Sequence, residues 1–134
     1  MLVAACGSGS QYSTSGGLVG VGLVLVSPVF FGSGTSAPAN LEVVVENRAA
    51  QPLVVRSVRA QSSGMVQWGI YPVQRTFNET INPGEAKSFP LFATAVARYA
   101  RMTPNEPLNV RAVVEFETAG KRYQELYHGQ AHEP

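Results

Sequence analysis

The chain has 134 residues, enough for one compact domain with a modest extension and too few for a catalytic domain beside a regulatory one. Hydrophobic residues make up 45% of it and charged residues 14%, so it is too apolar to be disordered throughout. Its net charge of +1 argues against nucleic acid as a partner. All nine acidic residues are glutamates, which excludes the usual Ser-His-Asp triad and Asp-based calcium loops.

The N-terminal segment, residues 1–40, carries no charge, since the first charged side chain is Glu42. Its start, Leu-Val-Ala-Ala-Cys, resembles a bacterial lipobox, and the resemblance implies lipid attachment at Cys6 on the periplasmic side of a bacterial membrane. Residues 7–17 are rich in Gly and Ser and suit a flexible tether. The basic and apolar parts of a secretory signal do not precede the cysteine. Either the stated start lies inside a longer precursor, or Cys6 is an ordinary buried thiol.

The most apolar segment is 18–31, which is too short and too rich in glycine to span a membrane as a helix. Its valines predict a strand buried on both faces that ends at Pro28. The alternative is a surface covered by lipid or by a hydrophobic partner, because large apolar patches are seldom exposed. We expect Val29, Phe30 and Phe31, beyond the proline, to make that contact. Residues 32–40 are expected to form a linker.

From Leu41 the sequence predicts about seven strands joined by turns, at 41–46, 53–60, 65–71, 73–80, 85–92, 108–118 and 121–128. Alternation in the first and sixth of these strands places Glu42, Glu46, Glu115 and Glu117 outward. It predicts a core containing Leu41, Val43, Val45, Val110, Val114 and Phe116. The alanine-rich segment 93–102 predicts one short helix. The expected fold is an all-β antiparallel sandwich over 41–128, followed by a tail at 129–134.

Several motifs resemble those of the late embryogenesis abundant β-sandwich group, which includes the water-stress and hypersensitive-response domain. They are the strand that ends at Asn47, the Pro-Leu-Val-Val strand beginning at Pro52, Trp68-Gly69, and the turn Ile81-Asn82-Pro83-Gly84. The resemblance covers most of 41–128. It implies an immunoglobulin-like sandwich and no enzymatic activity. Arg48, where the group usually has proline, and segment 93–102, which looks like an insertion, depart from its pattern.

Residues that could bind a metal ion or take part in catalysis form few clusters in the sequence. His128 and His132, with Glu125 and Glu133 nearby, are the one candidate metal site, but a glycine lies between the histidines and a solvated tail explains them better. We therefore expect no catalytic residue, no metal, no cofactor and no small-molecule substrate.

Two aromatic residues, Trp68 and Tyr71, lie in a segment expected to be an edge strand or a connecting loop. They are candidate contacts to a partner or a membrane, with core packing as the alternative for Trp68. The leading interpretation is a non-enzymatic, membrane-tethered accessory module that binds a protein in a membrane complex, for example a respiratory, photosynthetic or secretion assembly. A water-stress-type protective protein is the alternative, and a small metal-dependent enzyme is the third hypothesis.

Overall fold

The computed structural model describes residues 13–14, 16–64, 67–99 and 107–131, and for 13–14 the backbone alone. These residues contain nine strands and no helix. Within these ranges, no segment is a helix with the length and apolar character of a membrane span. The strands are β1 (Ser13–Thr14), β2 (Val19–Leu25), β3 (Ser36–Asn47), β4 (Leu53–Ser62), β5 (Trp68–Ile70), β6 (Val73–Ile81), β7 (Ala86–Ala97), β8 (Leu108–Thr118) and β9 (Lys121–Ala131).

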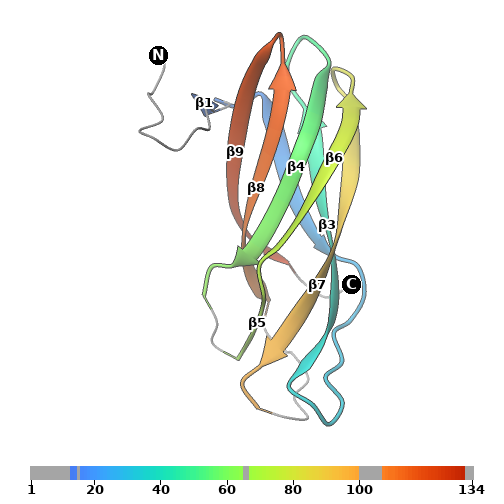
Figure 1. Cartoon of the computed structure of the whole chain (residues 1–134), viewed down its shortest axis with the longest axis vertical. Coiled ribbons are helices and arrows are strands. Elements are labelled where there is room, and N and C mark those ends of the chain that lie inside the picture. Colours follow the sequence, from blue (N-terminus) through green and yellow to red (C-terminus); the bar gives the residue numbers. More distant parts are fainter. Residues whose placement is uncertain (1–12, 15, 65–66, 100–106, 132–134) are drawn as a thin grey trace.

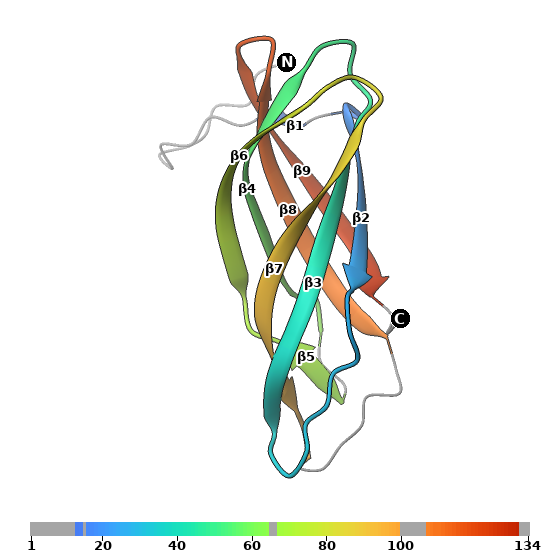
Figure 2. The same cartoon turned by 90° about the vertical axis from the view of Figure 1, so that its right-hand side faces the viewer.

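The strands form two sheets that lie face to face (Figures 1 and 2). The five-stranded sheet has the order β1-β9-β8-β4-β6, and the four-stranded sheet has the order β2-β3-β7-β5. Neighbouring strands are antiparallel except for the short β1, which runs parallel to β9. The prediction of an all-β, two-sheet antiparallel architecture is confirmed, with nine strands in the described residues rather than about seven.

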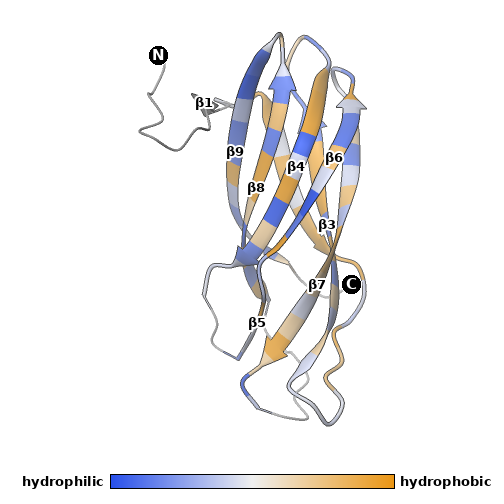
Figure 3. Cartoon of the chain, in the orientation of Figure 1, coloured by the Kyte–Doolittle hydropathy of each residue, from blue (hydrophilic) through white to orange (hydrophobic). Residues whose placement is uncertain are grey.

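The core lies between the sheets and follows the predicted alternation. All six side chains predicted for it are buried, namely Leu41, Val43, Val45, Val110, Val114 and Phe116. Blue and orange bands alternate along β4 and β8 in Figure 3, as expected for strands with one face on the core and one toward solvent. Phe77 of β6 and Phe89 of β7 join the two sheets at one edge, with ring centroids 4.9 Å apart in an edge-to-face arrangement.

The prediction of a helix over 93–102 is wrong for residues 93–97, because they continue strand β7. Residues 100–102 of that segment lie outside the described ranges. In β7 the alternation is strict, because Ala93, Ala95 and Ala97 are buried whereas Thr94 is exposed. Ala95 pairs with Ala37 of β3 on one side and with Ile70 of β5 on the other. Pairing on both sides outweighs the helix propensity of alanine, which is the highest of any residue.

The apolar N-terminal run also belongs to the sandwich. β2 pairs with β3 along its whole length, from Val19 opposite Asn47 to Leu25 opposite Leu41. It is an edge strand rather than one buried on both faces, and Val24 on its outer face is exposed. The expected linker is shorter as well, since β3 begins at Ser36. The sandwich therefore takes in residues on both sides of 41–128.

Candidate partner-binding surface

The structure divides the predicted contact residues into two groups. Val29, Phe31 and Trp68 are buried, and the rings of Phe31 and Trp68 meet edge to face with centroids 6.5 Å apart. By contrast, Phe30 is 76% exposed and Tyr71 is 58% exposed. Val29, Phe31 and Trp68 therefore belong to the core, and of the five predicted contact residues only Phe30 and Tyr71 are exposed.

Phe92 is a further exposed aromatic residue, and it is not among the contact residues predicted from the sequence. It lies in β7 and is 65% exposed, because the alternation that buries Leu91 and Ala93 turns it outward. An aromatic residue at an outward strand position is the signal that could have found it. Such a ring gains little by facing water, which makes it a natural anchor for a binding partner.

Arg75 of β6 supports the exposed ring. Its guanidinium carbon lies 5.0 Å from the ring centroid of Phe77 and 5.5 Å from that of Phe92. Its Nη1 also donates a hydrogen bond to the backbone carbonyl of Pro90 at 2.9 Å. These contacts connect β6 of one sheet with β7 of the other and restrict the side chains of Arg75 and Phe92. Less rotamer entropy of these two side chains would therefore be lost when a partner binds.

The register places further apolar side chains on the same outer face. Val24 lies opposite Glu42, which lies opposite Pro90, so these three residues cross β2, β3 and β7 in one row. In the next row, the backbone N–H of Val26 donates to the carbonyl of Asn40, and Asn40 pairs with Phe92. A third row holds Tyr71, whose backbone N–H donates to the carbonyl of Thr94. We call the exposed side chains of these rows the outer apolar face: Val24, Val26, Tyr71 and Phe92.

Among the residues of these rows, Glu42 is the one that carries a charge at neutral pH. It is half-buried and makes no ion pair or hydrogen bond with another side chain in the described part of the chain. A carboxylate between Val24 and Pro90 is only partly hydrated, which favours a partner that brings a positive charge to it. The outer apolar face therefore surrounds one carboxylate, that of Glu42, which can pair with a basic side chain.

Ser13 and Thr14, which lie within the segment expected to be a flexible tether, form strand β1 instead. β1 pairs with Tyr123 and Gln124 near the start of β9, at the upper end in Figure 1, whereas the loop containing Phe30 lies at the lower end. The twelve residues of β3 run between these ends and span about 40 Å. Cys6 itself lies outside the described residues.

The candidate metal site receives no support from the geometry. His128 is exposed on β9, opposite Arg111 of β8, while His132 and Glu133 lie outside the described residues. In the ranges that the structure covers, no three His, Cys, Asp or Glu side chains come together to hold a metal ion. Glu115 and Glu117 face outward as predicted, and both have partners, Ser57 for the former and Arg56 and Arg122 for the latter.

No family model and no curated protein matches the sequence. Among solved structures, the chain is similar to a FixG-related protein from Vibrio parahaemolyticus, with 13% identity over 85% of this chain and 96% of that one and a TM-score of 0.39. It is similar to a protein from Archaeoglobus fulgidus (11% identity, 84% and 90% coverage, TM-score 0.42). It also resembles part of a GH20 exo-β-N-acetylglucosaminidase from Vibrio harveyi (10% identity, 87% of this chain and 18% of that one, TM-score 0.45). At such low identities and TM-scores, these likenesses assign no activity.

Proposed function

We propose that the chain is a non-enzymatic accessory module, tethered through a lipid on Cys6 at the periplasmic side of a bacterial membrane, that binds a protein partner. The observation that carries this proposal is the outer apolar face, on which Phe92 is 65% exposed and braced by Arg75. Exposed apolar side chains that lie near one another often mark a surface where a protein contacts another molecule, since exposing such a patch to water is energetically unfavourable for a monomer. The partner presents an apolar surface with a basic side chain for Glu42.

The separation of the tether from Phe30 favours a protein partner over the lipid surface. Fully extended, the chain between Cys6 and Ser13 reaches roughly 25 Å. The loop of Phe30 lies at the end remote from β1, beyond the length of β3. A molecule standing on its tether would thus hold Phe30 away from the bilayer, within reach of a membrane-anchored complex.

The finer fold assignment is part of the same proposal, namely an immunoglobulin-like sandwich of the late embryogenesis abundant type. Two of the motifs behind that resemblance meet in space. The backbone N–H of Asn47 donates to the carbonyl of Glu85, and the N–H of Gly84 donates to the carbonyl of Asn47, both at 2.9 Å. The strand that ends in Asn and the Pro-Gly turn thus support each other structurally.

The experiment that tests partner binding uses the tagged full chain expressed in its native membranes. Phe92→Glu and Phe30→Glu place a charge on the proposed contact side chains. Thr80→Glu is the control, because Thr80 is exposed on β6 of the opposite sheet and belongs to neither proposed surface. We expect a stoichiometric partner to co-purify with the wild type and the control and to be lost from Phe92→Glu, since a desolvated unpaired carboxylate costs several kcal/mol. Thermal melts of the purified variants establish that each is folded.

Two outcomes would overturn this interpretation. If the partner stays bound in Phe92→Glu and Phe30→Glu while only their melting temperatures fall, the surface is not the interface. If no stoichiometric partner is found and the chain protects unrelated enzymes during drying equally well in both variants, the water-stress-type protective protein is the better assignment.

The tether has its own test. Cys6→Ser should release the protein from membranes washed at high salt, because burial of hydrocarbon is not screened by ions. Intact mass of the wild-type protein extracted from membranes gives the modification directly. An unmodified Cys6 in protein that still pellets with membranes would remove the lipid from the proposal and leave the partner as the anchor.

A further inference from the structure

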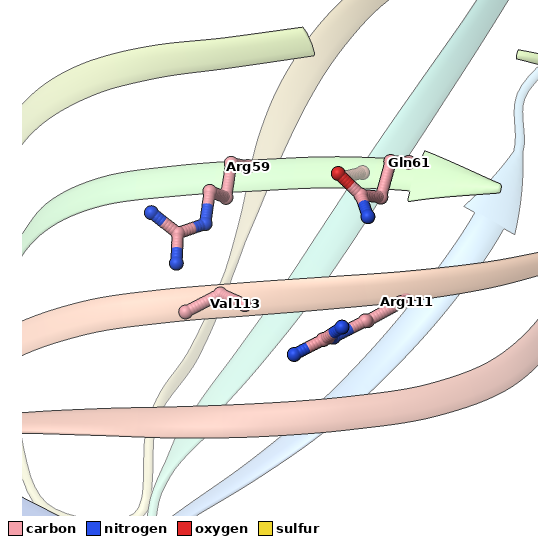
Figure 4. A pocket seen from close by; sticks show the side chains of 5 residues that line it. Arg59, Gln61, Arg111 and Val113 are labelled. Carbon is pink, nitrogen blue, oxygen red and sulfur yellow. The ribbon is translucent and has the colours of Figure 1, made fainter. Parts of the chain in front are cut away.

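A second surface feature lies on the outer face of the five-stranded sheet, away from the outer apolar face. It is a groove of about 350 Å³ between β4 and β8, lined by Arg59, Ala60, Gln61, Arg111 and Val113. Figure 4 shows Arg59 and Gln61 on β4 and Val113 and Arg111 on β8. The groove is large enough for part of a small organic ligand.

The strand register brings the two arginines to the same place. Arg59 lies opposite Val113, and Gln61 lies opposite Arg111, in the antiparallel pair of β4 and β8. In Figure 4 the guanidinium groups of Arg59 and Arg111 both lean toward Val113. Although Val113 faces outward, the residue is only 6% exposed, so its side chain forms an apolar floor beneath two cationic groups.

Neither guanidinium is neutralised within the described part of the chain. Arg59 and Arg111 take part in none of its ion pairs or side-chain hydrogen bonds. Glu117 pairs with Arg56 and Arg122. Glu115 keeps its negative charge, but it accepts a hydrogen bond from Ser57 and forms no ion pair with either arginine of the groove. Two unpaired positive charges therefore converge on one groove.

The surroundings of the arginines add apolar area beside the charge. Leu126 of β9 lies opposite Val113 and is exposed, and His128 lies opposite Arg111. A ligand held by the guanidinium groups would rest its carbon chain against Val113 and Leu126. Because β4 and β8 each have a neighbouring strand on both sides, their backbone N–H groups are committed to the sheet.

We propose that this groove binds a carboxylate group, with both arginines as donors and the attached hydrocarbon lying on Val113 and Leu126. The planar fork of a guanidinium matches the two oxygens of a carboxylate. Phosphate sites commonly add backbone N–H donors from a helix end or a turn, and the sheet has none to spare here. The site is independent of the proposed partner-binding surface, which lies on the other sheet.

The carboxylate can come from a free organic acid or from a glutamate side chain of a peptide, and the experiment separates these sources. The full chain, labelled with 15N and 13C, is titrated with hexanoate, with acetate, with inorganic phosphate and with a capped glutamate dipeptide at constant ionic strength. We expect hexanoate to shift the Val113 methyl and Arg59 and Arg111 Nε signals with a dissociation constant on the order of 1 mM. Tighter binding by the dipeptide than by hexanoate assigns the site to a polypeptide, and the reverse assigns it to a free acid.

Variants connect the response to the groove. Arg59→Gln and Arg111→Gln should each weaken hexanoate binding about tenfold, because each removes a charge-assisted hydrogen bond. Arg122→Gln is the matched control, since Arg122 is exposed on the same sheet but is ion-paired with Glu117. It should change the affinity less than about twofold. Val113→Thr, which keeps the shape of the floor, should reduce the preference for hexanoate over acetate.

Three results would overturn the proposal. If Arg122→Gln weakens hexanoate binding as much as Arg59→Gln and Arg111→Gln do, the binding depends on the overall positive charge of the sheet and not on the groove. Phosphate binding as tightly as hexanoate would exclude a carboxylate site, and equal affinities for acetate and hexanoate would exclude the apolar floor. Methyl shifts at Val113 that persist in the double variant of Arg59 and Arg111 would exclude the arginines as the donors.

Discussion

The side-chain amide of Asn47 donates a hydrogen bond to the backbone carbonyl of Ile81 at 2.9 Å, joining the end of β3 to the end of β6 across 34 residues of sequence. The same Nδ2 donates to the carbonyl of Gln51 at 2.9 Å, and Oδ1 accepts from the N–H of Ala49 at 2.8 Å. Asn47 is fully buried. One asparagine therefore satisfies three backbone groups at one end of the sandwich.

Removing this amide should destabilise the whole domain. In Asn47→Ala the backbone groups of Ala49, Gln51 and Ile81 lose their side-chain partner, and we expect the free energy of unfolding to fall by about 3 kcal/mol. Urea denaturation measures this change. Asn109→Ala, at an exposed position, is the control and should stay within about 0.5 kcal/mol of the wild type. A similar small effect at Asn47 would show that water replaces the lost contacts.

Phe116 is fully buried in β8 and stacks on Tyr123 of β9, with ring centroids 5.5 Å apart. Phe116→Ala should cost about 3 to 5 kcal/mol, through lost burial and the cavity that remains. Phe30→Ala is the matched control, because Phe30 is exposed and its truncation opens no cavity. Equilibrium denaturation of the two variants should therefore differ strongly, and equal losses would contradict the described core.

The hairpin between β8 and β9 turns through Ala119 and Gly120, which both have positive φ, 52° and 76°. Two successive residues of this kind are typical of a type I′ turn, for which Asn-Gly is preferred. Ala119→Asn should raise stability by about 0.5 to 1 kcal/mol, visible as a higher melting temperature. Gly120→Ala should lower it through backbone strain alone, since no atom lies within 4 Å of the position that a Cβ would take. A lower melting temperature for Ala119→Asn, or an unchanged or higher one for Gly120→Ala, would argue against this turn.

Glu117 lies between two arginines, with its Oε2 at 3.2 Å from Arg56 Nε and 3.4 Å from Arg122 Nε. These groups are partly exposed, so water and salt screen the pairs. Glu117→Gln should therefore cost no more than about 1 kcal/mol, and the difference should shrink in 1 M salt. Denaturation at low and high salt tests this, and a larger loss that salt does not change would indicate a tightly coupled network.

Local periodicity was the part of the fold that could be read from the residues. In 108–118 the alternation of small and branched apolar residues with arginine and glutamate predicts both the strand and its buried face, and β8 has those bounds. The turn at Asn82-Pro83-Gly84 is equally local, because proline and glycine restrict or permit particular φ values. Leu41 to Glu46 likewise predicts its own inward face, although β3 extends beyond it at both ends.

Pairing between distant strands was decided by the tertiary structure. Ala93 to Ala97 suits a helix by composition, and only its place between β3 and β5 makes it a strand. The same holds for the proposed sites. Arg75 reaches Phe92 and Arg59 faces Val113 because sheet topology brings together strands far apart in the chain. Alternation tells which side of a strand a residue faces, but the neighbour it meets there depends on which strands pack together to bury the core.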